Sequence, residues 1–356
     1  MMNHLKQIAA RLDEYGIDAM LVSSEPGERY AVGFKGEGYV VVAKNECRYF
    51  TDSRYIEAAE KQVTGTSVTM TDRAKNYRIL IQKAVDDLGI EKLGFEDGYM
   101  TVAQYRQLAD AFTCELVPAQ GLLGALRAAK DEEEIALMTK AQRISEQALE
   151  EILKFLRPGV SEKEVAAKLT YDMLRFGAEK MSFDPIVASG PNGSLPHAVP
   201  SDRAIQSGEF VTMDFGAVID GYSADMTRTV AVGEPTDEMR GLYELVRRAK
   251  DTATLAVAPG IACAEVDAVA RRVIAEGGYA DEFCHGLGHS IGLEGHEDPR
   301  FRADSNACVE EGLVMSVEPG VYLPGRLGLR IEDLIYVGPD GVESLNETAT
   351  DLVVLA

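Results

Sequence analysis

The chain has 356 residues, which is more than one hydrophobic core usually supports, so we expect two domains. Hydrophobic residues make up 46% of the chain and charged residues 26%, a balance that excludes a disordered or fibrous protein. The net charge of -22 repels phosphate backbones and anionic membrane surfaces, so neither nucleic acids nor membranes are expected partners.

The start of the chain has no feature of an export signal. Residues 1–16, MMNHLKQIAARLDEYG, have the pattern of an amphipathic helix with charges throughout. No stretch approaches 18 uninterrupted apolar residues, so no membrane span is expected. The five cysteines are scattered, odd in number and without CxxC spacing, as expected for reduced thiols in a cytosol. We therefore predict a cytoplasmic protein.

Short apolar runs alternate with helical patterns from residue 1 to about residue 125. The expected strands are residues 18–24, 38–44, 47–52, 67–71, 92–97 and 114–119. The expected helices are residues 5–15, 53–63, 77–89 and 102–112. This alternation predicts an α/β layer domain over residues 1–125. A long helical pattern over residues 126–159 then opens the second domain, residues 126–356, and ends at Pro158-Gly159.

The second domain contains an internal repeat. PGVSEKEVAAKL, from Pro158, and PGIACAEVDAVA, from Pro259, share a Pro-Gly-aliphatic opening, a Glu-Val six residues after the proline, and an amphipathic run. A strand-rich stretch with two acidic residues follows each copy. These acids are Asp214 and Asp225 in the first copy and Glu318 and Glu332 in the second. The pattern predicts a pseudo-symmetric domain whose halves face one another across a shared site.

The first pair of acids lies in a predicted hairpin, because Asp220-Gly221 is a preferred two-residue turn between alternating apolar runs. The turn predicts the cross-strand pairs Ile219–Tyr222, Gly216–Asp225 and Asp214–Thr227. Asp214 and Asp225 would then be diagonal neighbours on one face, roughly 7–8 Å apart or less. Thr227 would offer its hydroxyl to Asp214. Two like charges this close need a positive charge between them.

The second pair follows the same rule. Residues 316–337 contain a Pro-Gly loop near 324–325, and an odd-length loop places Glu318 and Glu332 on one face, together with Arg330. A single carboxylate on a strand usually faces solvent. Here the residues before Asp214 and Glu318 are apolar, which indicates burial, and buried carboxylates need a cation or a proton. We therefore expect the four acids to bind metal.

Three of the five histidines, His285, His289 and His296, fall within residues 284–297. The segment HGLGH does not match the zinc-protease helix HExxH, because the glutamate is missing and two glycines intervene. In an extended strand His285 and His289 share a face but stand about 13 Å apart. At most one of them can bind a given ion, and the others would reach the substrate or support the ligands.

His197 lies in a loop rich in Gly, Pro and Ser, residues 189–202, which can present a side chain at a site or can simply be a loop. His4 is expected at the surface. Four carboxylates and one histidine form an oxygen-rich ligand set that prefers Mn²⁺, with Co²⁺, Fe²⁺ or Zn²⁺ as alternatives, and four negative charges would balance two divalent ions. Two such ions can share a hydroxide and hold it against a carbonyl, which is hydrolytic chemistry.

Four motifs in this order resemble the pita-bread metallopeptidases: MDFGAVIDGYSADMTRT, HGLGHSIGLEGHE, SVEPGVY and LRIEDL, within about residues 190–335. That family includes Xaa-Pro dipeptidase (prolidase), aminopeptidase P, methionine aminopeptidase and the metal-free creatinase. The resemblance implies an α/β N-terminal domain and an α+β pita-bread catalytic domain with a pseudo-twofold internal repeat. It also implies a homodimer.

The same resemblance implies roles for individual residues. The implied ligands of two divalent metal ions are Asp214, Asp225, His289, Glu318 and Glu332. Asp225 and Glu332 would bridge the ions. The implied catalytic residues are Glu318 as general base, His197, which would assist the tetrahedral intermediate or the leaving group, and His296. The implied substrate contacts are His285, His296 and Arg330.

Within the family, creatinase lacks the metal ligands, and methionine aminopeptidases generally lack the additional N-terminal domain. The Xaa-Pro peptidases remain, and they resemble this chain in the PHAVPSDR loop around His197. The expected reaction is cleavage of the bond between an N-terminal residue and proline by a metal-bridged hydroxide. The compact length favours a prolidase-like dipeptidase, with an Xaa-Pro aminopeptidase or a metal-free binding module as alternatives.

Overall fold

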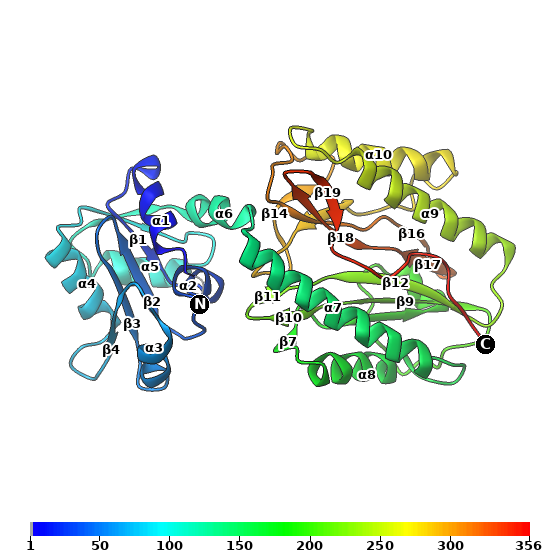
Figure 1. Cartoon of the computed structure of the whole chain (residues 1–356), viewed down its shortest axis with the longest axis horizontal. Coiled ribbons are helices and arrows are strands. Elements are labelled where there is room, and N and C mark those ends of the chain that lie inside the picture. Colours follow the sequence, from blue (N-terminus) through cyan, green and yellow to red (C-terminus); the bar gives the residue numbers. More distant parts are fainter. Residues whose placement is uncertain (1–2) are drawn as a thin grey trace. The chain divides into compact units, whose positions relative to one another are not determined.

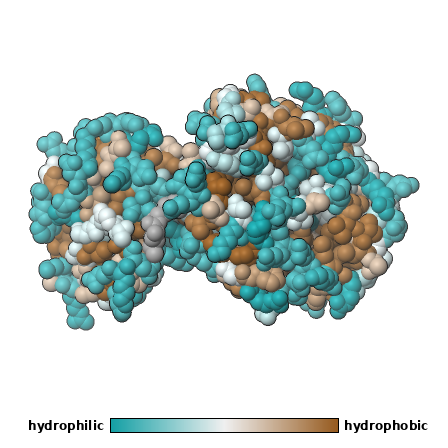
Figure 2. All heavy atoms as spheres, viewed as in Figure 1, coloured by the Kyte–Doolittle hydropathy of each residue, from teal (hydrophilic) through white to brown (hydrophobic). Residues whose placement is uncertain are grey.

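The computed structural model describes residues 3–356, so the first two residues of the expected N-terminal helix lie outside the described residues. The chain divides into two compact units, Met1–Arg127 and Ala128–Ala356 (Figure 1). The domain boundary at residues 125–126 stays a prediction. Every helix within residues 3–356 is too short or too polar to cross a membrane. Hydrophilic residues cover most of the face that Figure 2 shows.

The first unit is built on a six-stranded sheet. Its strands are β1 (Ala19–Val22), β2 (Tyr39–Ala43), β3 (Cys47–Thr51), β4 (Ser67–Met70), β5 (Lys92–Phe95) and β6 (Glu115–Pro118). The order is β4-β3-β2-β1-β5-β6, with β2 antiparallel to both neighbours and the other pairs parallel. All six lie where the sequence predicted strands. The α/β layer architecture is therefore confirmed for this unit.

The helices of the first unit include two that the sequence did not predict. The helices are α1 (Leu5–Arg11), α2 (Glu25–Val32), α3 (Ile56–Gln62), α4 (Tyr77–Leu88), α5 (Val102–Ala109) and α6 (Gln120–Ala128), with a 3-10 helix, η1 (Leu12–Tyr15). Helix α2 was missed because its Pro-Gly pair reads as a turn. Pro26 lies in the first turn, where its missing N–H costs nothing, and the Ser24 side chain accepts the Gly27 N–H at 3.0 Å.

Glu28 of α2 is a buried carboxyl with a pH-dependent effect on stability. The Tyr49 hydroxyl and the Gly38 N–H contact its oxygens, and burial raises the pKa of Glu28 from 4.5 to about 7. The folded state therefore holds this proton more tightly than the unfolded chain does. Protonated Glu28 therefore stabilises the folded state fully below pH 4.5, and this stabilisation is lost as the pH rises through about 7. The loss in the free energy of unfolding is about 3 kcal/mol.

We expect Glu28→Gln to lose this pH dependence. Chemical denaturation at pH 5 and pH 8 should show that the free energy of unfolding falls less between the two values in the variant than in the parent protein. Glu25→Gln, at an exposed position of the same helix, is the matched control and should keep the parent's dependence. An unchanged dependence in Glu28→Gln would contradict the prediction.

The second unit contains four small sheets. The four-stranded sheet joins β20 (Val354–Leu355), β12 (Met226–Val232), β9 (Glu209–Phe215) and β8 (Ile186–Ser189). The five-stranded sheet joins β14 (Glu297–Phe301), β13 (Gly288–Ser290), β15 (Val314–Val317), β18 (Asp333–Gly338) and β19 (Gly341–Ser344). The three-stranded sheet joins β11 (Tyr222–Ser223), β10 (Ala217–Ile219) and β7 (Lys180–Met181). The two-stranded sheet joins β16 (Gly320–Leu323) and β17 (Leu327–Arg330).

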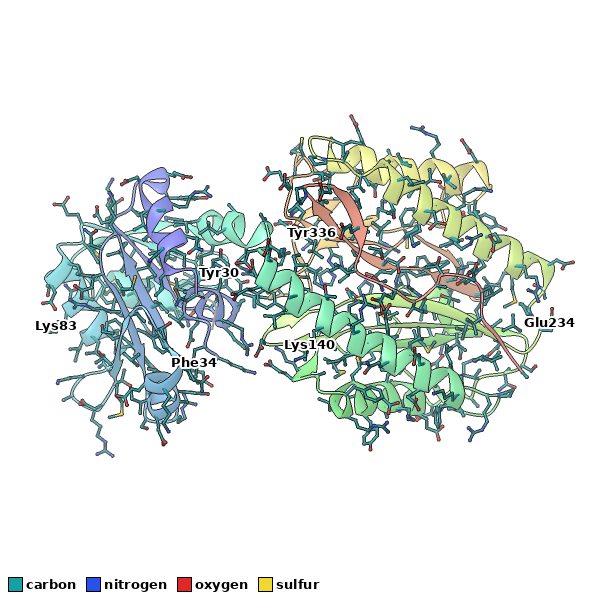
Figure 3. The ribbon with its side chains drawn as sticks, viewed as in Figure 1. Tyr30, Phe34, Lys83, Lys140, Glu234 and Tyr336 are labelled. Carbon is teal, nitrogen blue, oxygen red and sulfur yellow. The ribbon has the colours of Figure 1, made fainter. Side chains whose placement is uncertain are left out.

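Two helices cover the strands of each half of this unit (Figure 1). Helices α7 (Glu132–Phe155) and α8 (Glu162–Arg175) form one core with β9 and β12, while α9 (Asp237–Ala256) and α10 (Cys263–Glu276) form another with β15 and β18. Lys140 lies on the exposed side of α7 (Figure 3). Helices α8 and α10 have 14 residues each and begin at the same position of the two sequence repeats. The predicted internal repeat is therefore present in the structure.

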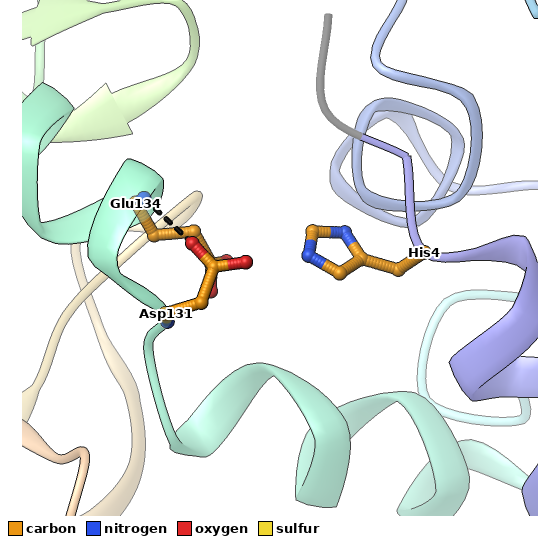
Figure 4. Close-up of side chains that lie close together, drawn as sticks. All are labelled: His4, Asp131 and Glu134. Carbon is orange, nitrogen blue, oxygen red and sulfur yellow. Dashed lines mark hydrogen bonds between the residues drawn. The ribbon is translucent and has the colours of Figure 1, made fainter.

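The long helix predicted over residues 126–159 is wrong in detail, because the chain leaves the helix at residues 129–131. Ala129 pairs with Leu313, and the Lys130 N–H donates to the Gly312 carbonyl at 2.8 Å. A new helix then begins after Asp131, whose side chain accepts the Glu134 N–H at 2.9 Å (Figure 4). Pairing with a distant strand thus overrides local helix propensity.

Candidate metal centre

The first hairpin has the predicted register but is interrupted where it passes from one sheet to another. Ile219 pairs with Tyr222 and Asp214 with Thr227, as predicted. The predicted pair Gly216–Asp225 is wrong, because β9 ends before Gly216 and β12 begins after Asp225. A Cβ at Gly216 would lie 1.8 Å from the Ala224 carbonyl oxygen, so only glycine permits this close approach.

The second hairpin is interrupted in the same way. Its cross-strand pairs are Val317–Asp333, Gly320–Arg330 and Leu323–Leu327. The loop is therefore residues 324–326, with the odd length that the sequence predicted. Glu318 and Glu332 both lie in the gap between the five-stranded sheet and the two-stranded one. In both halves, acidic residues lie where the strand pairing is interrupted: Asp225 in the first half, and Glu318 and Glu332 in the second. Their side chains therefore need not follow the regular alternation of a strand.

The acids of the two halves meet at His289. One ligand atom from each of Asp225, His289 and Glu332 lies within 4.8 Å of the others. The His289 Nε2 atom is 3.3 Å from Glu318 Oε1 and 3.8 Å from Asp225 Oδ2. Asp214, Asp225, His289 and Glu332 are buried, and Glu318 is partly exposed. Residues more than 100 positions apart in the chain thus form one cluster.

Arg330 joins Asp214 to this cluster. Its Nη2 donates to Asp214 Oδ2, and its Nε donates to Thr227 Oγ1 at 3.1 Å. The Thr227 hydroxyl donates to Glu332 Oε2 at 2.6 Å and not to Asp214, so the predicted Thr227–Asp214 contact is wrong. The opposing half supplies a better acceptor, which cross-strand geometry within one hairpin could not indicate.

The cluster carries more negative charge than its surroundings neutralise. Three buried oxygens, Asp214 Oδ1, Asp225 Oδ1 and Glu332 Oε1, have no hydrogen-bond partner within residues 3–356. Burial and the neighbouring carboxylates raise the pKa of Asp225 and of Glu332 well above their ordinary values. Burial also raises the pKa of Glu318 to about 7, although Arg330 opposes this shift. Orphaned oxygens with unbalanced charge are what a bound cation would satisfy, so the residues fit a divalent metal.

His289 is prepared to act as a ligand. Its Nδ1 lies 3.0 Å from the Ser290 carbonyl oxygen, which can only accept, so the ring carries its proton on Nδ1 and turns the Nε2 lone pair to the carboxylates. Burial lowers the pKa of His289 to about 3, which keeps the imidazole neutral. A neutral imidazole is the form that binds metal ions.

The other predicted histidines surround a cavity of about 430 Å³ beside the acids. The predicted site residues that line it are His197, Asp214, Asp225, His285, His289, His296, Glu318 and Arg330. Glu332 does not line this cavity but is buried next to Asp225 and His289. The ring of His296 is 4.1 Å from that of His289, measured between centroids. His197 is exposed, as a group that meets a substrate needs to be.

His285 does not share the position of His289. Its Nε2 lies 2.9 Å from the Tyr322 hydroxyl and its Nδ1 lies 2.7 Å from the Gly286 carbonyl oxygen. Burial lowers the pKa of His285 to about 4. The structure thus brings one histidine of HGLGH to the acids, which agrees with the limit that strand geometry set.

Sequence reasoning missed three residues at this site. The buried Tyr322 hydroxyl also accepts from Arg330 Nη1 at 2.8 Å, and nothing in its motif indicated this contact. Arg300 and Arg302 line the cavity, and their even spacing beside His296 was the available signal.

His4, expected at the surface, is instead buried, with its ring stacked on Tyr30 at 3.9 Å between centroids.

Two regions of the chain match known families. Residues 136–339 match Metallopeptidase family M24, and residues 4–129 match the Creatinase/Prolidase N-terminal domain. The chain belongs to metallopeptidase family M24. An Xaa-Pro dipeptidase of Pyrococcus furiosus is 35% identical to it, over 99% of this chain and 100% of the relative. The predicted family resemblance is thereby confirmed.

Solved structures of M24 relatives cover both units. An Xaa-Pro dipeptidase from Bacillus anthracis has 41% sequence identity and a TM-score of 0.95, over 99% of each chain. An X-Pro aminopeptidase from Thermotoga maritima has 34% identity and a TM-score of 0.92, over 99% of this chain and 100% of the other. The predicted α/β plus pita-bread fold is confirmed, and membership of M24 makes the protein a metal-dependent peptidase.

Proposed function

We propose that the protein is an Xaa-Pro dipeptidase that cleaves the bond between an N-terminal residue and proline. The observation that carries this proposal is the cluster of four acids and His289, of which Asp214, Asp225, Glu318 and His289 line the cavity, in a chain similar over its length to Xaa-Pro dipeptidases. A lone carboxylate pair would support many reactions, whereas this donor set with three orphaned oxygens calls for cations.

The five predicted ligands, Asp214, Asp225, His289, Glu318 and Glu332, would hold two divalent ions. Oxygen-rich sites of this kind suit Mn²⁺. When bound, the ions would polarise the scissile carbonyl and make water acidic. Manganese as the native ion, a homodimer and a cytoplasmic location stay predictions from the sequence.

The chain's own residues would then move the protons. Glu318 lies at the cavity with a raised pKa, so its carboxylate would accept a proton from the attacking water. His197 is exposed on the cavity wall and would donate a hydrogen bond to the developing oxyanion or to the leaving nitrogen. His285 and His296 would contact the substrate.

Arg330 contributes mainly by orienting other groups. Its guanidinium donates to Thr227, Asp214 and Tyr322 and to the Pro196 carbonyl, which engages four of its five N–H groups. Among the described residues, 3–356, this leaves one guanidinium N–H group for a substrate. We therefore place Arg330 chiefly as the residue that holds Asp214 in position.

Arg300 and Arg302 support a dipeptidase over an aminopeptidase. Both line the cavity, and an arginine there would bind the free carboxylate that a dipeptide presents directly after its proline. A longer peptide would place an uncharged amide at that point. The similarity to the Thermotoga maritima X-Pro aminopeptidase keeps the aminopeptidase as the second candidate.

We expect Ala-Pro and Met-Pro to be cleaved with added Mn²⁺, and Ala-Pro-Ala to have a kcat/KM lower by about tenfold or more, since it lacks the charged contact. Arg300→Gln should narrow the gap between the dipeptide and the tripeptide. Product analysis by chromatography measures the cleavage of Ala-Pro, Met-Pro, Ala-Pro-Ala and Ala-Ala. Equal cleavage of Ala-Ala would contradict the preference for proline, and faster cleavage of Ala-Pro-Ala would favour the aminopeptidase.

A further inference from the structure

We propose that Glu162 is a positioning residue for His197: it fixes the loop that carries this histidine and so acts on the reaction through it. The proposal rests on the proposed function of His197. Glu162 is the first residue of α8 and is completely buried. It lies outside the metal cluster and does not line the cavity.

One carboxylate holds both ends of the loop. Glu162 Oε1 accepts from Ser189 N at 2.7 Å, Ser189 Oγ at 2.8 Å and Asn192 Nδ2 at 3.1 Å. Glu162 Oε2 accepts from Asn192 Nδ2 at 3.0 Å, Ser201 N at 3.1 Å and Ser201 Oγ at 2.6 Å. These six hydrogen bonds join two points 12 residues apart, Ser189 and Ser201, and Asn192 between them to a single side chain.

The segment between these two points forms part of the substrate cavity. It begins with the short helix η2 (Gly190–Ser194), and residues 196–200, including His197, line the cavity. Val199 is 82% exposed, whereas Ala198 beside it is buried and the Pro196 carbonyl accepts from Arg330 Nη1 at 3.2 Å. Fixing both ends shortens the free span and restricts the places that His197 can reach. Arg203 adds to this by donating to Ser189 Oγ at 2.7 Å.

The helix itself does not need an acid at this position. Ser161 and Glu164 form the capping box of α8. In the second repeat, α10 begins at the equivalent position with Cys263, which carries no acid, and forms a helix of the same length without a side-chain cap. The charge of Glu162 therefore matches the loop and not the start of the helix, because five donor atoms converge on a carboxylate that has no N–H or O–H of its own.

Glu162→Gln tests the proposal while keeping the size of the side chain. Its amide nitrogen would face donors, so one end of the loop would come free. In the Mn²⁺-loaded, full-length protein, kcat/KM on Ala-Pro should fall by up to about 100-fold. Glu164→Gln, two residues along the same helix and exposed, is the matched control and should change kcat/KM less than about twofold.

A double-mutant cycle separates positioning from a general loss of structure. If Glu162 acts through His197, then adding Glu162→Gln to His197→Ala should cost less than about twofold, because the histidine is already gone. Bound Mn²⁺ should stay at the parent's level in each variant. Losses that multiply in the double variant would overturn the proposal. Should Glu162→Gln fail to fold, Ser201→Ala removes a single donor and enters the same cycle.

Hydrogen exchange separates the proposal from the proposed function. The Ser189 and Ser201 amides, which donate to Glu162, should lose protection in Glu162→Gln even if the parent protein cleaves no Xaa-Pro peptide. If the parent protein is inactive but the two amides lose protection in Glu162→Gln, the peptidase assignment is wrong and the role of Glu162 in anchoring the loop is supported. Unchanged protection of both amides would overturn the anchor.

Discussion

Replacing Glu318 with glutamine should lower kcat on Ala-Pro by about 100- to 10,000-fold, the range that a general base contributes. The amide cannot accept a proton from water at neutral pH. The parent carboxyl lies on the cavity wall, 3.3 Å from His289 Nε2, with a Ser316 hydroxyl donating to it at 3.1 Å. Glutamine keeps the shape and can still accept from Ser316, so the fold should be preserved.

Initial rates at saturating Mn²⁺, together with elemental analysis of the dialysed protein, measure this effect. Since Glu318 is also a predicted ligand, metal content distinguishes the loss of a base from the loss of an ion. Glu310→Gln, at an exposed position shortly before β15, is the control and should keep the parent's kcat. A Glu318→Gln protein that retains more than about a tenth of the parent's kcat would remove Glu318 from the role of base.

Removing divalent ions should abolish activity and lower thermal stability together. In the metal-free protein, burial and then repulsion from the neighbouring carboxylates raise the pKa of both Asp225 and Glu332. A cation that binds only the folded state stabilises it by about 2.7 kcal/mol at 100 times its Kd. We therefore expect the unfolding temperature to fall on chelation and to recover when Mn²⁺ is restored.

Asp225→Asn makes this prediction specific to the cluster. Without metal the variant should be at least as stable as the parent, because it removes one of the repelling charges. With Mn²⁺ it should gain less than the parent, because a ligand is lost. Calorimetric scans of both proteins with and without Mn²⁺ measure the four values. Equal gains in the two proteins would place the stabilising ion elsewhere.

The hairpins were predictable because their signals are local. Asp220-Gly221 specifies a two-residue turn, and the even separation of Glu318 and Glu332 specifies one face. What these signals could not give is the place where each ladder opens, since that depends on a neighbouring sheet. The same limit explains the Thr227 hydroxyl, which turns to Glu332 in the opposite half.

Other features depended on contacts that no short stretch of sequence records. The break at residues 129–131 exists because Ala129 pairs with Leu313. Helix α2 begins with a Pro-Gly pair, and a Cβ at Gly27 would lie 2.5 Å from Glu96 Oε1, so tertiary packing selects that glycine. Glu162 looked like an ordinary acid at the start of a helix, and its partners come from a loop 27 or more positions away.

The interrupted ladder of the second hairpin makes its two ends unequal in their tolerance of inserted residues. The pairs Val317–Asp333 and Gly320–Arg330 keep one register on both sides of the gap, so the direction of Glu318 depends on the spacing within it. Inserting one residue there would turn this acid to the opposite side of the strand. Lengthening the distal loop, residues 324–326, leaves that spacing untouched. We therefore expect a change of length to be tolerated better at the tip of this hairpin than in the gap beside Glu318 and Glu332.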